Sequence, residues 1–311
     1  MDFVKLEDPR IRSIVEKDGV VLIDSLLSKD EVADTRAQML RYEKEVLPGV
    51  PRVHYEFHPN GDLRSMSDMQ RYDEWWNKFG NQDRFFDLCR SVVDWDPVMF
   101  YLETFPKWPG CGPLRLHQEL FAGPVEPPQY MHLWIALDDV TNDNGGMIFY
   151  RGTHRFGLAP HIFQRDGLPE VDPKLVERLE HLRFEPDMPA GSAALFDGGL
   201  IHGSKGNITD RMRLAIVLAV RGRETVIHGD LDIFASIITR FFREEIGVDK
   251  CTAEDDFYQL GGDDESASRV LERIPEYFGI KLTKKHIAEL RNPRALAEEI
   301  IRITGWHDLN I

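Results

Sequence analysis

The segment LRLHQEL, residues Leu114–Leu120, places a histidine and a glutamate two positions apart within a short apolar run. Successive side chains alternate between the two faces of a β-strand, so we expect His117 and Glu119 to share one face. One strand would then offer two adjacent ligands to a single metal ion. A third ligand has to come from elsewhere, and His202 in LFDGGLIHGSKGN is the candidate, because it lies at the end of a second apolar run.

Two histidines and a carboxylate on one face of an octahedral ion form the facial triad that is typical of non-haem Fe(II) oxygenases. An H-x-E pair alone is a weak signal, because it recurs by chance and a single histidine is more often a surface or satisfied core residue. The combination with His202 is more specific, and Arg213 follows eleven residues later on the next expected strand. A fixed guanidinium can bind a carboxylate through two parallel hydrogen bonds.

Around these residues, the chain from about Pro97 to Arg221 consists of short apolar or alternating runs separated by Gly, Pro, Asn and Asp. The runs are VMFYLETF, LRLHQEL, YMHLWIAL, GMIFYRG, SAALFDG and RLAIVLAV. Several short strands at such spacing favour an all-β sandwich or barrel. Residues 9–45 before them predict helix, strand (Val20–Ile23) and helix, with Ser28 and Glu31 as a capping box for the second helix.

After about residue 228 the apolar spacing becomes helical. The expected helices lie in DLDIFASIITRFFREEIG, SASRVLERIPEYFG and NPRALAEEIIRI, the last with Asn292 as its N-cap and Pro293 at its first position. The stretch VRGRETVIHGD is the expected joint. We therefore predict two domains, residues 1–227 and residues 228–311, the second a small all-α helical bundle.

The overall composition disfavours several classes of partner. The 311-residue chain carries a net charge of −15, which argues against nucleic acid or an anionic membrane as a partner. No apolar run approaches the roughly 18–20 residues that a membrane span needs, and MDFVKLEDPR has no apolar signal core. Three distant cysteines fit a reducing compartment. We expect a cytoplasmic protein.

Taken together, the motifs resemble the phytanoyl-CoA dioxygenase family of Fe(II)/2-oxoglutarate oxygenases over residues 10–222. The matching segments are DGVVLIDSLLSKDEV, LRLHQEL, MHLWIALDDVTNDNGGMIFYRGTHRFG, AGSAALFDGGLIHGSKGN and RMRLAI. The resemblance implies a mainly β fold, a double-stranded β-helix (jelly-roll, cupin-like) barrel with flanking helices. The resemblance also implies that the catalytic metal ligands are His117, Glu119 and His202. It implies that Arg213 binds the distal carboxylate of 2-oxoglutarate and that nearby contacts to this cosubstrate come from Ser204, Trp134 and Gln118.

Some positions depart from the family or leave alternatives open. Glu119 stands where the family usually has Asp, yet a carboxylate is present, which disfavours halogenation because halogenating relatives lack it. Arg151 replaces the usual proline of a PGSH-like element and is either a substrate contact or a solvated surface residue. His132 is expected to share an inward strand face with Trp134. It is either a substrate contact or a satisfied core histidine.

The implied activity is oxidation of an unactivated C–H bond of a small molecule in a biosynthetic pathway. It would be coupled to decarboxylation of 2-oxoglutarate to succinate. The implied cofactors are Fe(II), 2-oxoglutarate and O2, with ascorbate as a reductant. Hydroxylation is the default outcome, while desaturation, cyclisation and epoxidation share the same first step and are not separated by the sequence.

The tail DDFYQLGGDDESASRVLERIPEYFGIKL resembles the peptidyl and acyl carrier domains of nonribosomal peptide and polyketide synthases. Asp264 stands where the family has the serine that carries phosphopantetheine, either natively or by design. Ser266 lies about 200° further around a helix and cannot simply replace it. Pro275 would weaken or kink the second helix. The resemblance implies a degenerate carrier-like domain; a generic helical bundle is the alternative.

Such a domain would act by docking to a biosynthetic synthase, by self-association or by stabilising the barrel, with a substrate that is free or carrier-tethered. A different class of function also fits these features, a non-catalytic jelly-roll scaffold that docks to a peptide or polyketide synthase through its tail. The set of His117, Glu119, His202 and Arg213 favours the enzyme, because a scaffold has no need of all four.

Overall fold

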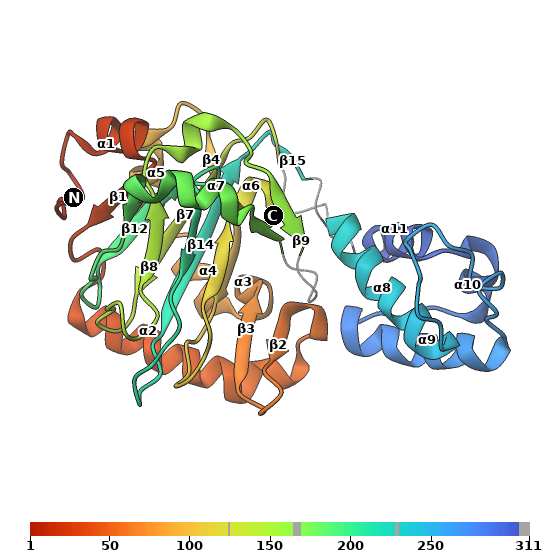
Figure 1. Ribbon diagram of the computed structural model, residues 1–311. Helices are drawn as coiled ribbons and strands as arrows, with labels where there is room; N and C mark the ends of the chain where they lie inside the picture. The colour runs from red at the N-terminus through yellow and green to blue at the C-terminus, as the bar shows by residue number, and fades with distance from the viewer. Residues whose placement is uncertain (124, 164–168, 228–229, 305–311) are drawn as a thin grey trace. The chain divides into compact units, whose positions relative to one another are not determined.

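The computed structural model describes residues 1–123, 125–163, 169–227 and 230–304 (Figure 1). The chain folds into two compact units, Met1–Gly49 with His54–Val226, and Val50–Val53 with Ile227–Ile311. The domain boundary expected between residues 227 and 228 stays a prediction, and His228 and Gly229 beside it lie outside the described residues.

A seven-stranded antiparallel sheet forms the base of the first unit. In order across the sheet, its strands are β1 (Val20–Ile23), β12 (Ala193–Asp197), β7 (Tyr130–Ala136), β14 (Ala215–Gly222), β4 (Pro97–Thr104), β3 (Leu63–Ser67) and β2 (Tyr55–Phe57). Strands β7 and β14 are buried along their whole length. A strand that is covered on both faces does not need polar residues at alternate positions, which explains the continuous apolar runs in these two segments.

A second, four-stranded sheet packs against the inner face of the first. Its strands, in order, are β11 (Arg183–Phe184), β8 (Met147–Tyr150), β13 (His202–Ser204) and β5 (Leu114–His117). Phe149 of β8 packs with Phe196 of β12 and Val217 of β14 in one buried apolar core. Two short strand pairs are also present, β9 (His161–Phe163) with β10 (Pro169–Val171), and β6 (Val125–Glu126) with β15 (Val226–Ile227). The predicted barrel with flanking helices is confirmed.

Short helices flank the strands of this unit, several of them packed on β1 and β4 of the large sheet and α7 on β10. They are α1 (Ile11–Asp18), α2 (Lys29–Arg41), α3 (Met69–Tyr72), α4 (Glu74–Gly80), α5 (Asp83–Val92), α6 (Glu119–Ala122) and α7 (Pro173–Leu179). Strand β1 has the bounds that the sequence predicts. The predicted capping box of α2 is also present: Ser28 accepts a hydrogen bond from the Glu31 amide, and its own amide donates to the Glu31 carboxylate.

The second unit is a helical bundle (Figure 1). Its helices are α8 (Asp230–Ile246), α9 (Asp264–Phe278), α10 (Lys284–Leu290) and α11 (Pro293–Thr304). Three of them were predicted. The short α10 was missed, because its seven residues give little helical periodicity. Asn292 caps α11 by accepting a hydrogen bond from the Ala295 amide at 2.9 Å. Helix α9 continues through Pro275 to a left-handed cap at Gly279. No helix in the described ranges combines the length and the apolar character needed to cross a membrane.

Candidate metal and cosubstrate site

Strands β5 and β13 bring the two candidate histidine ligands together. The strands pair antiparallel, and His117 lies directly opposite His202 in their register. Residues directly opposite each other in an antiparallel pair point to the same face, so both imidazoles enter the space between the sheets. Their ring centroids lie 4.4 Å apart. Strand pairing therefore joins two residues that are far apart in the sequence.

Glu119 does not lie on this strand, so the predicted strand geometry of the H-x-E pair is wrong. Strand β5 ends at His117, and Glu119 is the first residue of helix α6. Gln118 between them is buried, and its side-chain amide bonds backbone groups at Gly157, Ala159 and Gly199. These bonds fix the turn between strand and helix, and the Glu119 carboxylate still reaches the histidines.

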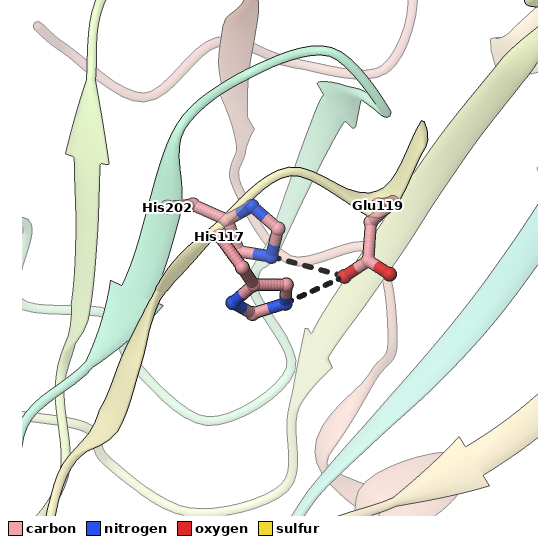
Figure 2. A group of neighbouring side chains, drawn as sticks. All are labelled: His117, Glu119 and His202. Carbon is pink, nitrogen blue, oxygen red and sulfur yellow. Dashed lines mark hydrogen bonds and ion pairs between the residues drawn. The ribbon is translucent and has the colours of Figure 1, made fainter. Parts of the chain in front are cut away.

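One carboxylate oxygen of Glu119 faces both rings (Figure 2). Its Oε1 lies 3.2 Å from His117 Nε2 and 3.1 Å from His202 Nε2. Three such ligand atoms, one from each residue, lie within 4.8 Å of one another. Ligands about 2.1 Å from an ion and at right angles to each other are about 3 Å apart. The two short spacings therefore suit neighbouring positions around one octahedral ion.

The second nitrogen of each ring is bonded to the backbone. His117 Nδ1 lies 2.8 Å from the carbonyl oxygen of Arg115, and His202 Nδ1 lies 3.0 Å from that of Leu200. A carbonyl oxygen only accepts, so each Nδ1 carries the hydrogen and each Nε2 presents its lone pair. Burial lowers the pKa of His202, which favours the neutral ring that binds metals, whereas at His117 the neighbouring Glu119 carboxylate outweighs burial and raises the pKa. Two lone pairs that face one carboxylate oxygen repel it unless a cation lies between them, so the donor set fits a metal ion.

A third histidine, His132 on β7, approaches the same carboxylate. Its Nδ1 lies 3.4 Å from Glu119 Oε1, and its Nε2 lies 3.1 Å from the Tyr130 hydroxyl, which in turn bonds the Tyr101 hydroxyl at 2.5 Å. Burial lowers the pKa of His132 to about 4, so its ring is neutral at neutral pH and can donate to the carboxylate. His132 thus holds the carboxylate in place as well as lining the cavity.

Two buried cations lie side by side in the same cavity. The backbones of Arg213 and Lys107 form a two-way hydrogen-bonded bridge, with N···O distances of 2.9 and 3.0 Å. One Arg213 amino group donates to the Gly145 carbonyl, while its Nε is buried without a hydrogen-bond partner. Burial lowers the pKa of Arg213 to about 10, and burial followed by the charge of Arg213 lowers the pKa of Lys107 to about 8. Among the described residues no carboxylate pairs with either cation, so the pair fits an anionic ligand such as the distal carboxylate of 2-oxoglutarate.

Lys107 was not identified from the sequence. A lysine in the loop segment KWPGCGP has no signal of its own, because its significance comes from the backbone bridge to Arg213. Trp134 was identified, and its ring lies 5.4 Å from the guanidinium carbon of Arg213. Ser204 on β13 is buried and lines the same cavity.

The cavity has a volume of about 500 Å3 and is lined by the metal-site residues, the two cations and His132. This volume lies within the range of small-molecule sites. Two other predicted contacts do not line it within the part of the chain that the structure describes. The Gln118 amide is engaged by backbone groups, and the Arg151 guanidinium lies over the Phe184 ring at 5.5 Å. The structure therefore gives Gln118 a role in fixing the turn and does not bring Arg151 to the cavity.

In the helical unit, Asp264 is the exposed first residue of α9. The preceding Asp263 is the N-cap and accepts hydrogen bonds from the Glu265 and Ser266 amides. The Ser266 hydroxyl is buried, donates to the Asp263 carboxylate at 2.7 Å and accepts from the Asp263 amide at 2.8 Å. This hydroxyl is committed to the cap, which agrees with the expectation that Ser266 does not replace a serine at position 264.

Comparisons with known proteins agree with this geometry. The family model described as phytanoyl-CoA dioxygenase (PhyH) matches residues 15–215, and the model described as phosphopantetheine attachment site matches residues 236–300. The ectoine dioxygenase of Nocardia farcinica is 28% identical over 237 residues, which cover 69% of this chain and 78% of that protein.

Solved structures show the same fold at low sequence identity. EctD from S. alaskensis with 2-oxoglutarate and 5-hydroxyectoine has a TM-score of 0.60 at 19% identity, covering 71% of this chain and 78% of that chain. The epimerase SnoN in complex with Fe3+, alpha ketoglutarate and nogalamycin RO has a TM-score of 0.57 at 20% identity, covering 71% and 84%. Because the first family model spans more than half of the residues, this chain belongs to the phytanoyl-CoA dioxygenase family of 2-oxoglutarate-dependent non-haem oxygenases.

Proposed function

We propose that this chain binds one Fe(II) ion through His117, Glu119 and His202 and hydroxylates an unactivated C–H bond of a small molecule in a biosynthetic pathway. One observation carries the proposal: two histidine Nε2 atoms converge on one carboxylate, in the same cavity as two buried cations that have no carboxylate partner among the described residues. Family membership supports the same assignment.

In this proposal, Arg213 and Lys107 hold the distal carboxylate of 2-oxoglutarate, with Ser204 and Trp134 beside it. His132 holds the Glu119 carboxylate in place, and apolar side chains such as Phe196 limit the access of water. Bound iron would supply the oxidation, in which O2 delivers one oxygen atom to 2-oxoglutarate, giving succinate and CO2, and the other to the substrate. Ascorbate is the expected reductant that keeps the iron ferrous.

We also propose that the helical unit acts by docking to a biosynthetic synthase or by self-association, rather than by carrying a substrate itself. Its match to the phosphopantetheine attachment family supports a partner linked to such a synthase. Phosphopantetheine transfer needs a hydroxyl nucleophile, and Asp264 has none. The substrate would then be free or be delivered on another carrier protein.

Succinate formation with Fe(II), 2-oxoglutarate, O2 and ascorbate tests the activity, with candidate substrates supplied as free acids and as carrier-linked thioesters. Product mass separates the outcomes, because hydroxylation adds one oxygen atom whereas desaturation removes two hydrogens. Iron analysis of the purified protein tests the site independently of the substrate. A protein that binds no iron and forms no succinate would contradict the proposal and leave the scaffold as the better explanation.

A further inference from the structure

Besides Glu119 of the metal site, the carboxyl group of Glu103 on β4 also faces the cavity. Within the large sheet, Val217 of β14 pairs with Trp134 of β7 on one side and with Glu103 on the other. Directly opposite residues of antiparallel strands share a face, so these three side chains point the same way. All three line the cavity. Across the sheet, Glu103 on β4 therefore follows Trp134 on β7 and Val217 on β14, and Trp134 is the residue of these three that lies beside Arg213.

Glu103 has neither a hydrogen-bond nor an ion-pair partner within the described ranges of the chain, unlike other charged groups around the cavity. The rim residue Arg64 pairs with Glu56 at 2.9 Å, and the Lys107 ammonium donates to the Gly112 carbonyl at 2.8 Å. Burial, and next the charge of Glu119, raise the pKa of Glu103 well above its usual range. An unpaired carboxyl group in such a position destabilises the folded protein, and groups of this kind are characteristic of binding and catalytic sites.

The charged side chains that line the cavity carry both signs. Arg213 and Lys107 present positive charge and suit a carboxylate. Glu103, beyond Val217, is a carboxyl group that an adjacent ammonium group would stabilise in its ionised form, in which it accepts hydrogen bonds from that ammonium. An ammonium group could donate hydrogen bonds to Glu103 while the rest of the substrate extends toward the metal ligands.

We propose that Glu103 determines substrate specificity by binding a protonated primary amine of the substrate. This inference rests on the function proposed above, because it takes the cavity as the site where substrate and 2-oxoglutarate meet. It narrows the substrate class to amine-bearing small molecules, including aminoacyl groups on a carrier. The amine would anchor the substrate and leave a more distant C–H bond toward the metal ligands.

Calorimetric binding to protein loaded with redox-inactive Zn(II) and 2-oxoglutarate tests this inference without turnover. The probes are linear and cyclic primary amines and aminoacyl N-acetylcysteamine thioesters, each paired with its N-acetylated form. We expect at least one free amine to bind roughly tenfold more tightly than its capped form, about the effect of one charge-assisted hydrogen bond. If no free amine is preferred over its capped form, the inference is overturned.

The variant Glu103→Gln keeps the size and most of the hydrogen-bonding capacity of the side chain but removes the charge. It should abolish the amine preference and leave the dissociation constant of 2-oxoglutarate within about twofold of wild type. Glu43→Gln is the matched control, because Glu43 is also a partly buried carboxyl with a raised pKa but does not line the cavity. This control should keep the preference.

Thermal unfolding of the Glu103→Gln variant tests the inference without any ligand. Because Glu103 has no partner among the described residues, Glu103→Gln should raise the melting temperature by about 2–4 °C. A fall in melting temperature would mean that Glu103 has a structural role, and it would overturn the inference. Failure of wild type to bind Zn(II) and 2-oxoglutarate would instead refute the function proposed above, and this inference with it.

Discussion

The barrel and the helical unit both match known families, but they differ in what their sites contain. In the barrel, the His117, Glu119 and His202 side chains converge. Arg213 lines the same cavity, and its Nε has no hydrogen-bond partner among the described residues. In the helical unit, a buried apolar core and a capped α9 are present, whereas Asp264 stands at the position that we predict for the attachment serine. One unit therefore has both fold and chemistry, and the other has the fold alone.

The difference follows from where the two sets of residues lie. Arg213 is buried and has no carboxylate partner among the described residues, and a buried charge without such a partner costs stability. A barrel that bound nothing would be more stable with apolar residues there. Asp264 is exposed at the start of a helix, where an acidic side chain is favourable, so the fold places no constraint on the hydroxyl. A match to a family therefore reflects the packing residues spread along the chain, whereas the chemistry can depend on one functional group, here the hydroxyl at position 264.

Restoring the serine gives the largest expected contrast. Wild-type protein incubated with coenzyme A and a broad phosphopantetheinyl transferase should show no change in intact mass. Asp264→Ser should gain one phosphopantetheine, because the hydroxyl returns on an otherwise carrier-like helix. Asp264→Ala is the control and should stay unmodified. A mass gain by wild type would mean that another residue accepts the group and that the site is wrongly assigned.

Removing one histidine ligand should leave the barrel folded but without its chemistry, as we infer for the helical unit. His202→Ala is expected to lose bound iron and to reduce succinate formation to background, because even partners outside the ligand set cost about 10–100-fold in metal affinity. Iron content and succinate are measured together. His181→Ala changes an exposed histidine and should leave both values unchanged. Iron retained by His202→Ala at the wild-type level would remove His202 from the ligand set.

Arg213→Ala should act on the cosubstrate and spare the metal. Loss of one partner of a buried ion pair costs roughly 3–5 kcal/mol, which corresponds to about 100-fold to several thousand-fold weaker binding of 2-oxoglutarate. Binding is measured by calorimetry on metal-loaded protein. Arg211→Ala is the matched control two residues away, because the Arg211 side chain is 92% exposed. Equal affinities for the two variants would exclude Arg213 as the carboxylate anchor.

The sequence predicted well those features that depend on neighbours in the chain. The β1 strand, the Ser28 cap of α2 and the Asn292 cap of α11 each arise from a local pattern, and each is present. The sequence also placed His202 with His117, although only the register of β5 and β13 explains why they meet. Local patterns thus predicted the strands and caps, and the spacing of the motifs together with the resemblance to a family predicted the ligand set.

Features that depend on distant contacts were missed or misplaced. Glu119 was expected on a strand, but the bonds that Gln118 makes to other loops turn the chain into α6 before Glu119. Lys107 gains its role only from the backbone bridge to Arg213. Glu103 becomes notable only because the pairing of β4 with β14 turns it toward the cavity. None of these contacts leaves a periodicity in the sequence.

The smallest expected effect is a difference in helix stability between substitutions at two adjacent residues of α9, the N-cap and the predicted attachment position. Asp263 and Asp264 are adjacent and both exposed, but only Asp263 accepts hydrogen bonds from the first-turn amides. Asp263→Ala should therefore cost about 0.5–2 kcal/mol of helix stability through loss of the N-cap. Asp264→Ala should cost less, about 0.3–1 kcal/mol, because it removes only a favourable charge near the helix N-terminus.

Hydrogen exchange of the α9 amides in the full chain measures this difference, because local opening can be followed without unfolding the barrel. Faster exchange in Asp263→Ala than in Asp264→Ala would show that the cap maintains the helix while position 264 is free to vary. If Asp264→Ala loosened α9 more, Asp264 would have a structural role of its own. Its presence at the serine position would then serve the fold, and the contrast between the two units would be weaker than we infer.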